Sequence, residues 1–141
     1  MASYVGACHC GIVHVEFRTE RDPNVWPLRQ CTCSFCIRFA GVYTSDPAGA
    51  IAIQTNAELK RYQFGQRTAE FLFCPNCGVY FGATALIGDA RFGVLSVRVL
   101  ERVLLDHGKA KPMDFDDETV ELRTARRRQN WTPMTIAEPP E

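Results

Sequence analysis

The sequence predicts a mainly β protein with little helix. Short runs of β-branched and aromatic residues recur along the first 100 of the 141 residues, and turn-forming residues separate them. The first of these runs alternates apolar and polar side chains with the period of two that a half-buried strand requires. Hydrophobic residues make up 46% of the chain, which is enough for the core of one small domain. We therefore expect a single folded unit built from strands and turns.

The first expected element is a strand over residues 12–17. Val13, Val15 and Phe17 alternate there with polar residues, so the three apolar side chains share one face. Residues 21–24 contain aspartate, proline and asparagine, which favour a turn. The chain is thus expected to open with a strand that turns back toward the first cysteines of the middle cluster.

The later elements are expected to be further short strands. A short helical turn is predicted just after Cys36, and a helix-like segment is predicted at residues 84–88. The β-prone runs lie at residues 41–44, 51–54, 59–64, 68–73, 79–81 and 94–100. Turn residues between these runs limit each strand to a few residues.

The C-terminal part has a different character. Acidic residues between 114 and 118 give way to four arginines and then to prolines, so residues 114–128 read as a short charged helix or loop. We place the end of the zinc-binding domain at residue 125 and expect an irregular tail over residues 126–141. The arginines fit a phosphate-binding patch, but a solvated face beside the acidic run is the interpretation we adopt. They are Arg123, Arg126, Arg127 and Arg128.

The charge balance excludes two classes of partner. Sixteen basic and sixteen acidic residues cancel, so the chain has no net field for nucleic acid or an anionic membrane. Small molecules or a second copy of the chain, in a homo-oligomer, are the expected partners. The N-terminus lacks the pattern of a secretory signal, and no run approaches about 18 apolar residues. We therefore expect a cytoplasmic protein.

Seven cysteines are the most informative residues of the sequence. In a reducing compartment, clustered cysteines are metal ligands more often than disulfides, and an odd number disfavours complete pairing. The three clusters are Cys8 with Cys10, then Cys31 with Cys33 and Cys36, then Cys74 with Cys77.

The first and last clusters together predict a closed zinc site. A tetrahedral zinc with Zn–S bonds of about 2.3 Å needs thiolates about 3.8 Å apart. Cys74 and Cys77 flank a short turn, as in a zinc knuckle, and the glycine that follows permits a left-handed backbone. Cys8 and Cys10 are two residues apart, so their side chains leave an extended segment on the same face. Two pairs make a four-thiolate structural site.

The middle cluster then has three thiolates and no fourth cysteine. Zinc with three protein ligands and one vacant position is the pattern of a catalytic site. Other partitions stay open at this point, with Cys36 as a spare thiol or with His9 as a ligand. A reversible disulfide between Cys33 and Cys36 is a further alternative, as in thiol redox proteins.

Four segments of the chain carry a resemblance to a known family, in order and spacing, over roughly residues 4–100. They are Gly6-Ala7-Cys8-His9-Cys10-Gly11, Cys31-Thr32-Cys33-Ser34-Phe35-Cys36-Ile37-Arg38, Tyr62-Gln63-Phe64-Gly65 and Phe73-Cys74-Pro75-Asn76-Cys77-Gly78-Val79-Tyr80-Phe81. Together they resemble the glutathione-dependent formaldehyde-activating enzymes and the related centromere protein V domain. Three cysteine clusters in this order are far more specific than one CxxC motif.

The resemblance implies several small coiled antiparallel β-sheets around two zinc ions. It assigns Cys8, Cys10, Cys74 and Cys77 to the structural zinc, and Cys31, Cys33 and Cys36 to the catalytic zinc. The implied activity is that of a carbon–sulfur lyase working in its synthetic direction. An S-(hydroxymethyl)glutathione synthase of this kind joins glutathione, as co-substrate, to formaldehyde. Arg38 is the candidate contact for anionic glutathione.

Two hypotheses about function follow from these observations. In the first, the chain is a zinc enzyme that adds a glutathione-like thiol to formaldehyde or a related small aldehyde. In the second, both zincs are structural and the chain is a noncatalytic binding or interaction module. The open coordination position at Cys31, Cys33 and Cys36 favours the enzyme.

Overall fold

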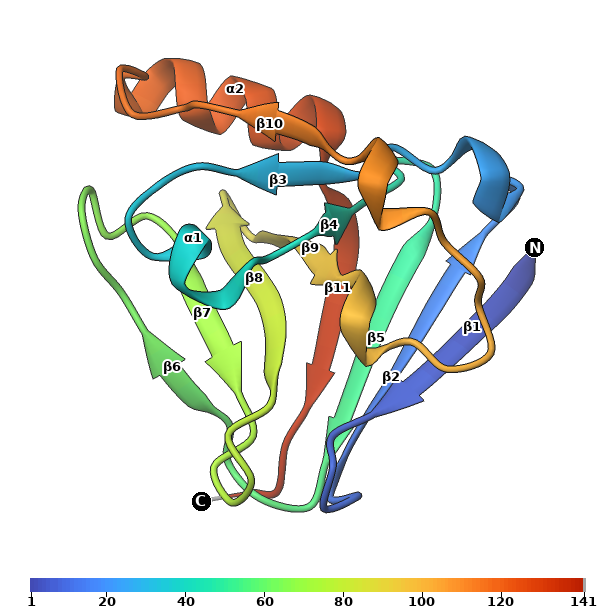
Figure 1. Ribbon diagram of the computed structural model, residues 1–141. Coiled ribbons are helices and arrows are strands. Elements are labelled where there is room, and N and C mark those ends of the chain that lie inside the picture. Colours follow the sequence, from blue (N-terminus) through green and yellow to red (C-terminus); the bar gives the residue numbers. More distant parts are fainter. Residues whose placement is uncertain (141) are drawn as a thin grey trace.

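The structure is a computed structural model that describes residues 1–140, and it is mainly β, which confirms the predicted fold class (Figure 1). The strands are β1 (Ala2–Ala7), β2 (Val13–Thr19), β3 (Arg29–Cys31), β4 (Tyr43–Thr44), β5 (Ala50–Thr55), β6 (Lys60–Tyr62), β7 (Glu70–Phe73), β8 (Tyr80–Ile87), β9 (Ala90–Ser96), β10 (Lys111–Met113) and β11 (Thr132–Ala137). The α-helices are α1 (Cys36–Phe39) and α2 (Val120–Asn130), and the short 3₁₀ turns are η1 (Pro23–Val25), η2 (Val97–Val99) and η3 (His107–Lys109).

The strands join into one open, branched sheet, where several small sheets were expected. Its main path runs β1-β2-β5-β11-β9-β4-β3-β10, and β8 branches from β9 to carry β7 and β6. Most neighbours are antiparallel, but β11 runs parallel to β5 and β10 runs parallel to β3. Figure 1 shows β1, β2 and β5 on one side, β6, β7 and β8 on the other, and β3, β10 and α2 crossing one end. Three of the cysteines lie at or directly after strand ends: Cys8 after β1, Cys31 at the end of β3 and Cys74 after β7.

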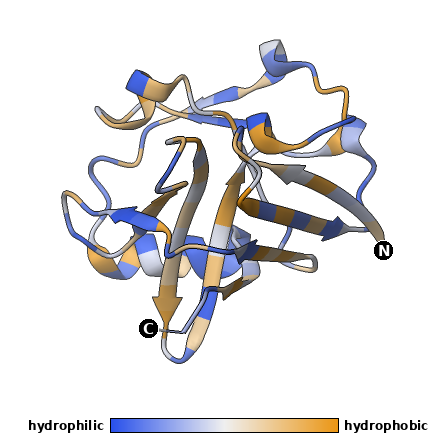
Figure 2. Cartoon of the chain, turned by 90° about the horizontal axis from the view of Figure 1, so that it is seen from below, coloured by the Kyte–Doolittle hydropathy of each residue, from blue (hydrophilic) through white to orange (hydrophobic). Residues whose placement is uncertain are grey.

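The predicted alternation of the second strand is observed directly. Val13, Val15 and Phe17 are buried in the main core, and the residues between them are not. Ile51 and Ile53 of the neighbouring β5 are each 1% exposed and complete this layer. Figure 2 shows hydrophobic and hydrophilic residues alternating along the strands. One face of the sheet therefore provides the core, as expected for a half-solvated sheet.

A second, smaller cluster of buried residues lies beside the middle cysteines. It includes Cys36, Tyr43, Tyr80 and Trp131, packed against the partly buried Cys31 and its aromatic neighbours. These residues come from α1, β4, β8 and the end of α2, which are far apart in sequence. The middle cysteines are thus held by a core of their own.

The prediction of an irregular tail over residues 126–141 is wrong for its described part. Residues 126–130 complete α2, and β11 enters the sheet between β5 and β9. Trp131, Thr132 and Met134 are buried, while Pro133 is exposed. The period-two pattern of a strand is present there, but the prolines obscured it. Thr119 caps α2, because its Oγ1 accepts a hydrogen bond from the N–H of Leu122 at 3.2 Å.

The predicted helix-like segment at residues 84–88 is also wrong. Residues 80–87 form β8, paired with β9 through a hairpin whose turn includes Gly88, with φ of +63°. The alanines and leucine there have good helix propensity, but pairing on both edges of β8 overrides that preference.

Candidate functional site

The first group of cysteines lies where the loop after β1 meets the loop after β7. The structure brings together Cys8, Cys10, Cys74 and Cys77, whose sulfur atoms all lie within 4.8 Å of one another. Cys10 Sγ is 3.6 Å from both Cys8 Sγ and Cys74 Sγ. Two segments that are 64 residues apart in sequence therefore meet at one point.

Backbone N–H groups point at two of these sulfur atoms. The N–H of Val13 lies 3.4 Å from Cys8 Sγ, and the N–H groups of Asn76 and Cys77 each lie 3.4 Å from Cys74 Sγ. Donors of this kind favour the thiolate form that a metal requires. The loops thus supply both the sulfur ligands and the dipoles that orient them.

The turn after β7 has the predicted knuckle geometry. Gly78 has φ of +80°, and its N–H donates to the carbonyl of Cys74 at 3.1 Å. A backbone hydrogen bond from Val79 lowers the pKa of Cys77 to about 6. The turn therefore favours the thiolate form of Cys77 that a metal ion requires.

The second group consists of Cys31 at the end of β3, Cys33 in the following loop and Cys36 at the start of α1. Their sulfur atoms also lie within 4.8 Å of one another. The N–H of Cys36 points at Cys33 Sγ at 3.3 Å, so the first turn of α1 closes the group. A hydrogen bond from the Cys36 thiol lowers the pKa of Cys31 to about 6. That contact, followed by burial, raises the pKa of Cys36.

A pair of buried tyrosines supports this second group, and no pattern in the sequence predicted their role. Tyr43 Oη lies 3.2 Å from Cys36 Sγ and 2.8 Å from Tyr80 Oη. Burial is the main reason that the pKa values of both phenols are raised, so both hydroxyls keep their protons. When Cys36 is a thiolate, as it would be on a metal ion, it can only accept; Tyr43 then donates to it and Tyr80 donates to Tyr43.

Both groups suit a soft metal ion. At the four-cysteine group the observed sulfur separations of 3.6 Å agree with the roughly 3.8 Å expected around tetrahedral zinc. The sulfurs of the three-cysteine group lie within 4.8 Å of one another, and every donor in both groups is a thiol. Across residues 1–140, no histidine or carboxylate joins the three-cysteine group, and His9 joins neither group. The structure therefore has the partition of four and three, with Cys36 inside its group and no disulfide at any of the seven cysteines.

A cavity of about 140 Å³ adjoins the three-cysteine group. Cys31, Cys33 and Cys36 line one part of it, and Arg29 and Tyr43 lie beside them. Residues of α2 and of the segment before it also line the cavity. The sulfur atoms are therefore accessible to a small molecule.

An aromatic cluster forms the apolar wall near the cysteines. Phe35 lies in the cysteine loop, and its ring centroid is 4.5 Å from that of Phe71 and 5.3 Å from that of Phe64. Phe64 and Phe71, which stack at 5.0 Å, both line the cavity. These side chains make the packed wall that limits water around the sulfurs.

The model of the family described as glutathione-dependent formaldehyde-activating enzyme matches residues 3–114. The chain belongs to this family. It is also similar to a crystal structure of a Rhodobacter sphaeroides protein, with 31% sequence identity and a TM-score of 0.60. That similarity covers 77% of this chain and 97% of the other.

The family match includes all seven cysteines and ends before α2. Family membership therefore supports, in general terms, a glutathione-dependent role in formaldehyde activation. No helix within residues 1–140 has the length and apolar character needed to span a membrane. Helix α2, whose residues line part of the cavity, lies outside the residues that the family model matches.

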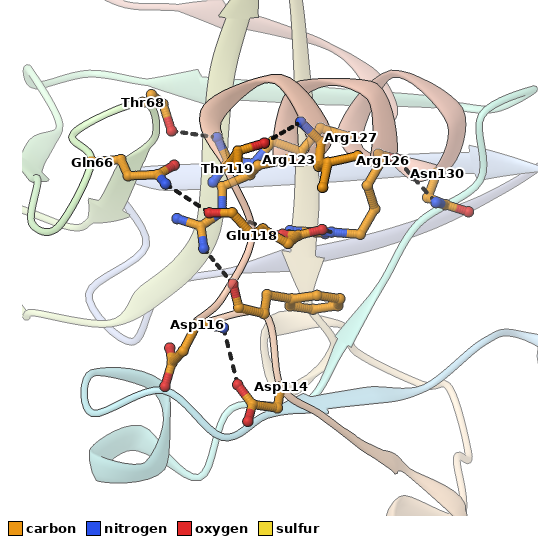
Figure 3. Close-up of polar contacts among 12 residues, drawn as sticks. Gln66, Thr68, Asp114, Asp116, Glu118, Thr119, Arg123, Arg126, Arg127 and Asn130 are labelled. Carbon is orange, nitrogen blue, oxygen red and sulfur yellow. Dashed lines mark hydrogen bonds and ion pairs between the residues drawn. The ribbon is translucent and has the colours of Figure 1, made fainter.

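Helix α2 contributes three arginines to the cavity, shown in Figure 3. Glu118 accepts from Arg126 at 2.8 Å and 2.9 Å and from Arg123 at 3.3 Å. The Arg126 guanidinium also lies 3.6 Å from the centroid of the Phe115 ring. Arg127 has no carboxylate partner in the described part of the chain, and its Nη1 donates to Thr68 Oγ1 at 2.8 Å.

The expectation that these arginines form a solvated face is therefore wrong for Arg127, which is 8% exposed. Only Arg128 is fully on the surface. The proposed substrate contact at Arg38 is not observed either, because Arg38 is exposed, does not line the cavity and donates to the carbonyl of Ser34. The positive charges at the cavity come instead from the arginines of α2 and from Arg29.

Proposed function

We propose that this protein adds a glutathione-like thiol to formaldehyde or a related small aldehyde, at a zinc held by Cys31, Cys33 and Cys36. The observation that supports this most directly is the contrast in donor number between the two cysteine groups. Four sulfurs saturate a tetrahedral ion, whereas three sulfurs beside a cavity leave one position for a reactant. The matched family gives the general reaction.

We further propose that Cys8, Cys10, Cys74 and Cys77 hold a structural zinc, so that the chain binds two ions. When bound by the three cysteines, zinc would lower the pKa of a reactant thiol and polarise an aldehyde oxygen. The thiol donor set supports zinc at both groups, and the 3.6 Å sulfur separations support it further at the four-cysteine group.

The side chains around the three-cysteine group have separate tasks in this proposal. Tyr43 donates to Cys36 and Tyr80 donates to Tyr43, which fixes the orientation of the Cys36 sulfur. Phe64 and Phe71 keep bulk water away from the reactants. None of these residues reacts covalently.

The overall reaction balances without an oxidant or reductant. The sulfur of the thiol forms a bond to the aldehyde carbon, and the carbonyl becomes a carbon–oxygen single bond. The thiol proton passes to that oxygen, which gives an S-hydroxymethyl product. The reverse reaction breaks the carbon–sulfur bond, which is the lyase direction.

The compartment that we infer is the cytoplasm. None of the seven cysteines forms a disulfide, and all of them lie in groups that could hold a metal ion, which fits a reducing compartment. A reducing compartment also supplies the low-molecular-weight thiol that the proposed reaction consumes.

The experiment that tests this function compares rates of adduct formation. Zinc-loaded protein, glutathione and formaldehyde are mixed, and exchange NMR measures the rate of S-hydroxymethyl exchange above the spontaneous rate. We expect acceleration with wild type and with the surface variant Arg128→Gln, and none with Cys31→Ala. A wild-type rate equal to the spontaneous rate, in protein with two zincs, would favour the noncatalytic module instead.

A further inference from the structure

One cationic side chain in the cavity has no charged partner. Arg127 is 8% exposed, and its Nε has no hydrogen-bond partner within residues 1–140. Its guanidinium carbon lies 4.8 Å from the centroid of the buried Trp131 ring, and its one polar side-chain contact is the neutral Thr68. A buried guanidinium normally has a carboxylate or phosphate partner, because its desolvation is costly.

A second arginine on the cavity wall also has no carboxylate partner among the described residues. Arg29 lies on β3, two residues before Cys31, and its Nη2 donates to Ser45 Oγ at 2.6 Å. It makes no ion pair with any described carboxylate. Burial lowers the pKa of Arg29, and the charge of Arg126 lowers it further. The surroundings of Arg127 and Arg29 would therefore favour the binding of an anion.

The remaining charges do not neutralise these two. Glu118 pairs with Arg123 and Arg126, as Figure 3 shows, and it is not among the residues that line the cavity. Asp116 does line the cavity, but it forms no ion pair with an arginine. Four arginines therefore meet two carboxylates around this cavity. Three thiolates on a divalent ion would add one net negative charge, which still leaves an excess of positive charge.

We propose that Arg127, with Arg29 on the same cavity, binds a carboxylate of the reactant and makes the three-cysteine site selective for carboxylate-bearing substrates. A planar guanidinium binds a carboxylate through two parallel N–H groups, which also fixes the orientation of the bound molecule. The cavity holds the arginines and the sulfurs together, so one small molecule can reach both. This inference rests on the proposed function, and α2 lies beyond the matched family region.

The carboxylate has two possible sources, and both are tested. It belongs either to the thiol, as in glutathione, or to the aldehyde, as in glyoxylate. The probes are glutathione, its diethyl ester with both carboxylates blocked, and glyoxylate. Calorimetry measures the Kd of each for the zinc-loaded wild type, Arg127→Gln and the control Arg128→Gln, which changes a surface arginine of the same helix.

We expect Arg127→Gln to weaken the binding of at least one free acid by roughly 10- to 100-fold, the loss expected for a charge-assisted hydrogen bond. The diethyl ester should bind all three proteins equally, and Arg128→Gln should match wild type. Arg127 dependence with glutathione assigns the carboxylate to the thiol, and dependence with glyoxylate assigns it to the aldehyde. Arg127→Lys, which keeps the charge in a conservative replacement, should recover part of the affinity.

Two results would overturn the inference. One is an unchanged Kd for both free acids in Arg127→Gln and Arg127→Lys. The other is an equal loss for acid and ester, which would show that Arg127 only supports the fold. Binding is measured without turnover, so the two proposals fail separately. Binding that depends on Arg127, without adduct formation, would contradict only the proposed function. Adduct formation with unchanged Kd values in the Arg127 variants would contradict only this inference.

Discussion

The two cysteine groups use the same ligand atom but differ in what surrounds it. At the four-cysteine group, backbone N–H groups of two loops contact the sulfurs. At the three-cysteine group, Cys36 contacts a buried tyrosine, and a cavity with unpaired arginines adjoins the sulfurs. Backbone N–H groups thus contact sulfurs in both groups, but a buried hydroxyl, an aromatic wall and unpaired arginines surround only the group with three thiols. This difference is what the proposed division into a structural and a reactive site predicts.

The largest effect should come from breaking the four-cysteine group. Cys74→Ser removes a ligand that joins segments 64 residues apart, and a cross-link of that span is worth about 4 kcal/mol in chain entropy alone. We expect insoluble protein, or a greatly reduced melting temperature with loss of zinc. Soluble, zinc-replete protein that melts with wild type would contradict the structural role of this group.

The matched change at the other group should affect the fold much less. Cys33→Ala removes a partly exposed sulfur beside the cavity, while the two core clusters stay intact. We expect a folded protein that has lost one zinc and all thiol-adduct formation. Circular dichroism, metal analysis and the exchange assay measure these three properties. If Cys33→Ala unfolds as completely as Cys74→Ser, the proposed distinction between the groups is wrong.

Removing the tyrosine hydroxyl should have an intermediate effect. Tyr43→Phe leaves Cys36 and Tyr80 without their shared hydrogen-bond partner, which should cost about 1 kcal/mol of unfolding free energy. The reorientation of Cys36 should lower kcat/KM by about tenfold, as expected for loss of a group that orients a metal ligand.

The control for this change is Tyr62→Phe, because Tyr62 is 48% exposed and its hydroxyl has no partner in the described structure. Denaturant unfolding and the exchange assay should leave Tyr62→Phe unchanged. Equal unfolding free energies and equal kcat/KM for the two variants would contradict the positioning role of Tyr43.

The smallest predicted effect concerns the ion pairs under α2. Arg126 donates hydrogen bonds to Glu118 and so lowers the pKa of that carboxyl. A carboxyl with a lowered pKa stabilises the fold above its unfolded pKa of about 4.3, and this stability is lost as the pH falls through the folded value. Glu118→Gln should therefore reduce stability by about 1 kcal/mol at pH 7 and flatten its dependence on pH below about 4.3.

The control here is Glu101→Gln, which changes an exposed glutamate outside α2 that makes no ion pair among the described residues. We expect Glu118→Gln to be less stable than this control at pH 7. Equal unfolding free energies of the two variants from pH 7 down to pH 3 would contradict the predicted contribution.

The sequence predicted the cysteine partition because short-range spacing sorts the sulfurs into two pairs and one trio, and two pairs supply the four thiolates of a closed zinc site. It also predicted the buried face of β2, because Val13, Val15 and Phe17 alternate cleanly. It could not single out Tyr43 or Arg127. Tyr43 lies in an ordinary β-prone run, and Arg127 is one of four arginines beside an acidic segment. Their roles depend on β4 and α2 meeting at one cavity, which is long-range information.

The C-terminal strand shows the same limit. Trp131, Thr132 and Met134 have the alternation of a strand, but the prolines around them favoured a tail. Only the pairing of β11 between β5 and β9 shows that this segment is central to the sheet.

The most direct test of the account measures whether one of two bound ions has a position open to a thiol. Cadmium replaces zinc in wild type and in Cys33→Ala, and ¹¹³Cd NMR is recorded with and without glutathione. We predict two resonances in wild type, one of them absent from Cys33→Ala, and glutathione should shift only that one. Two resonances that both stay unmoved at saturating glutathione, or a single resonance in wild type, would contradict the account.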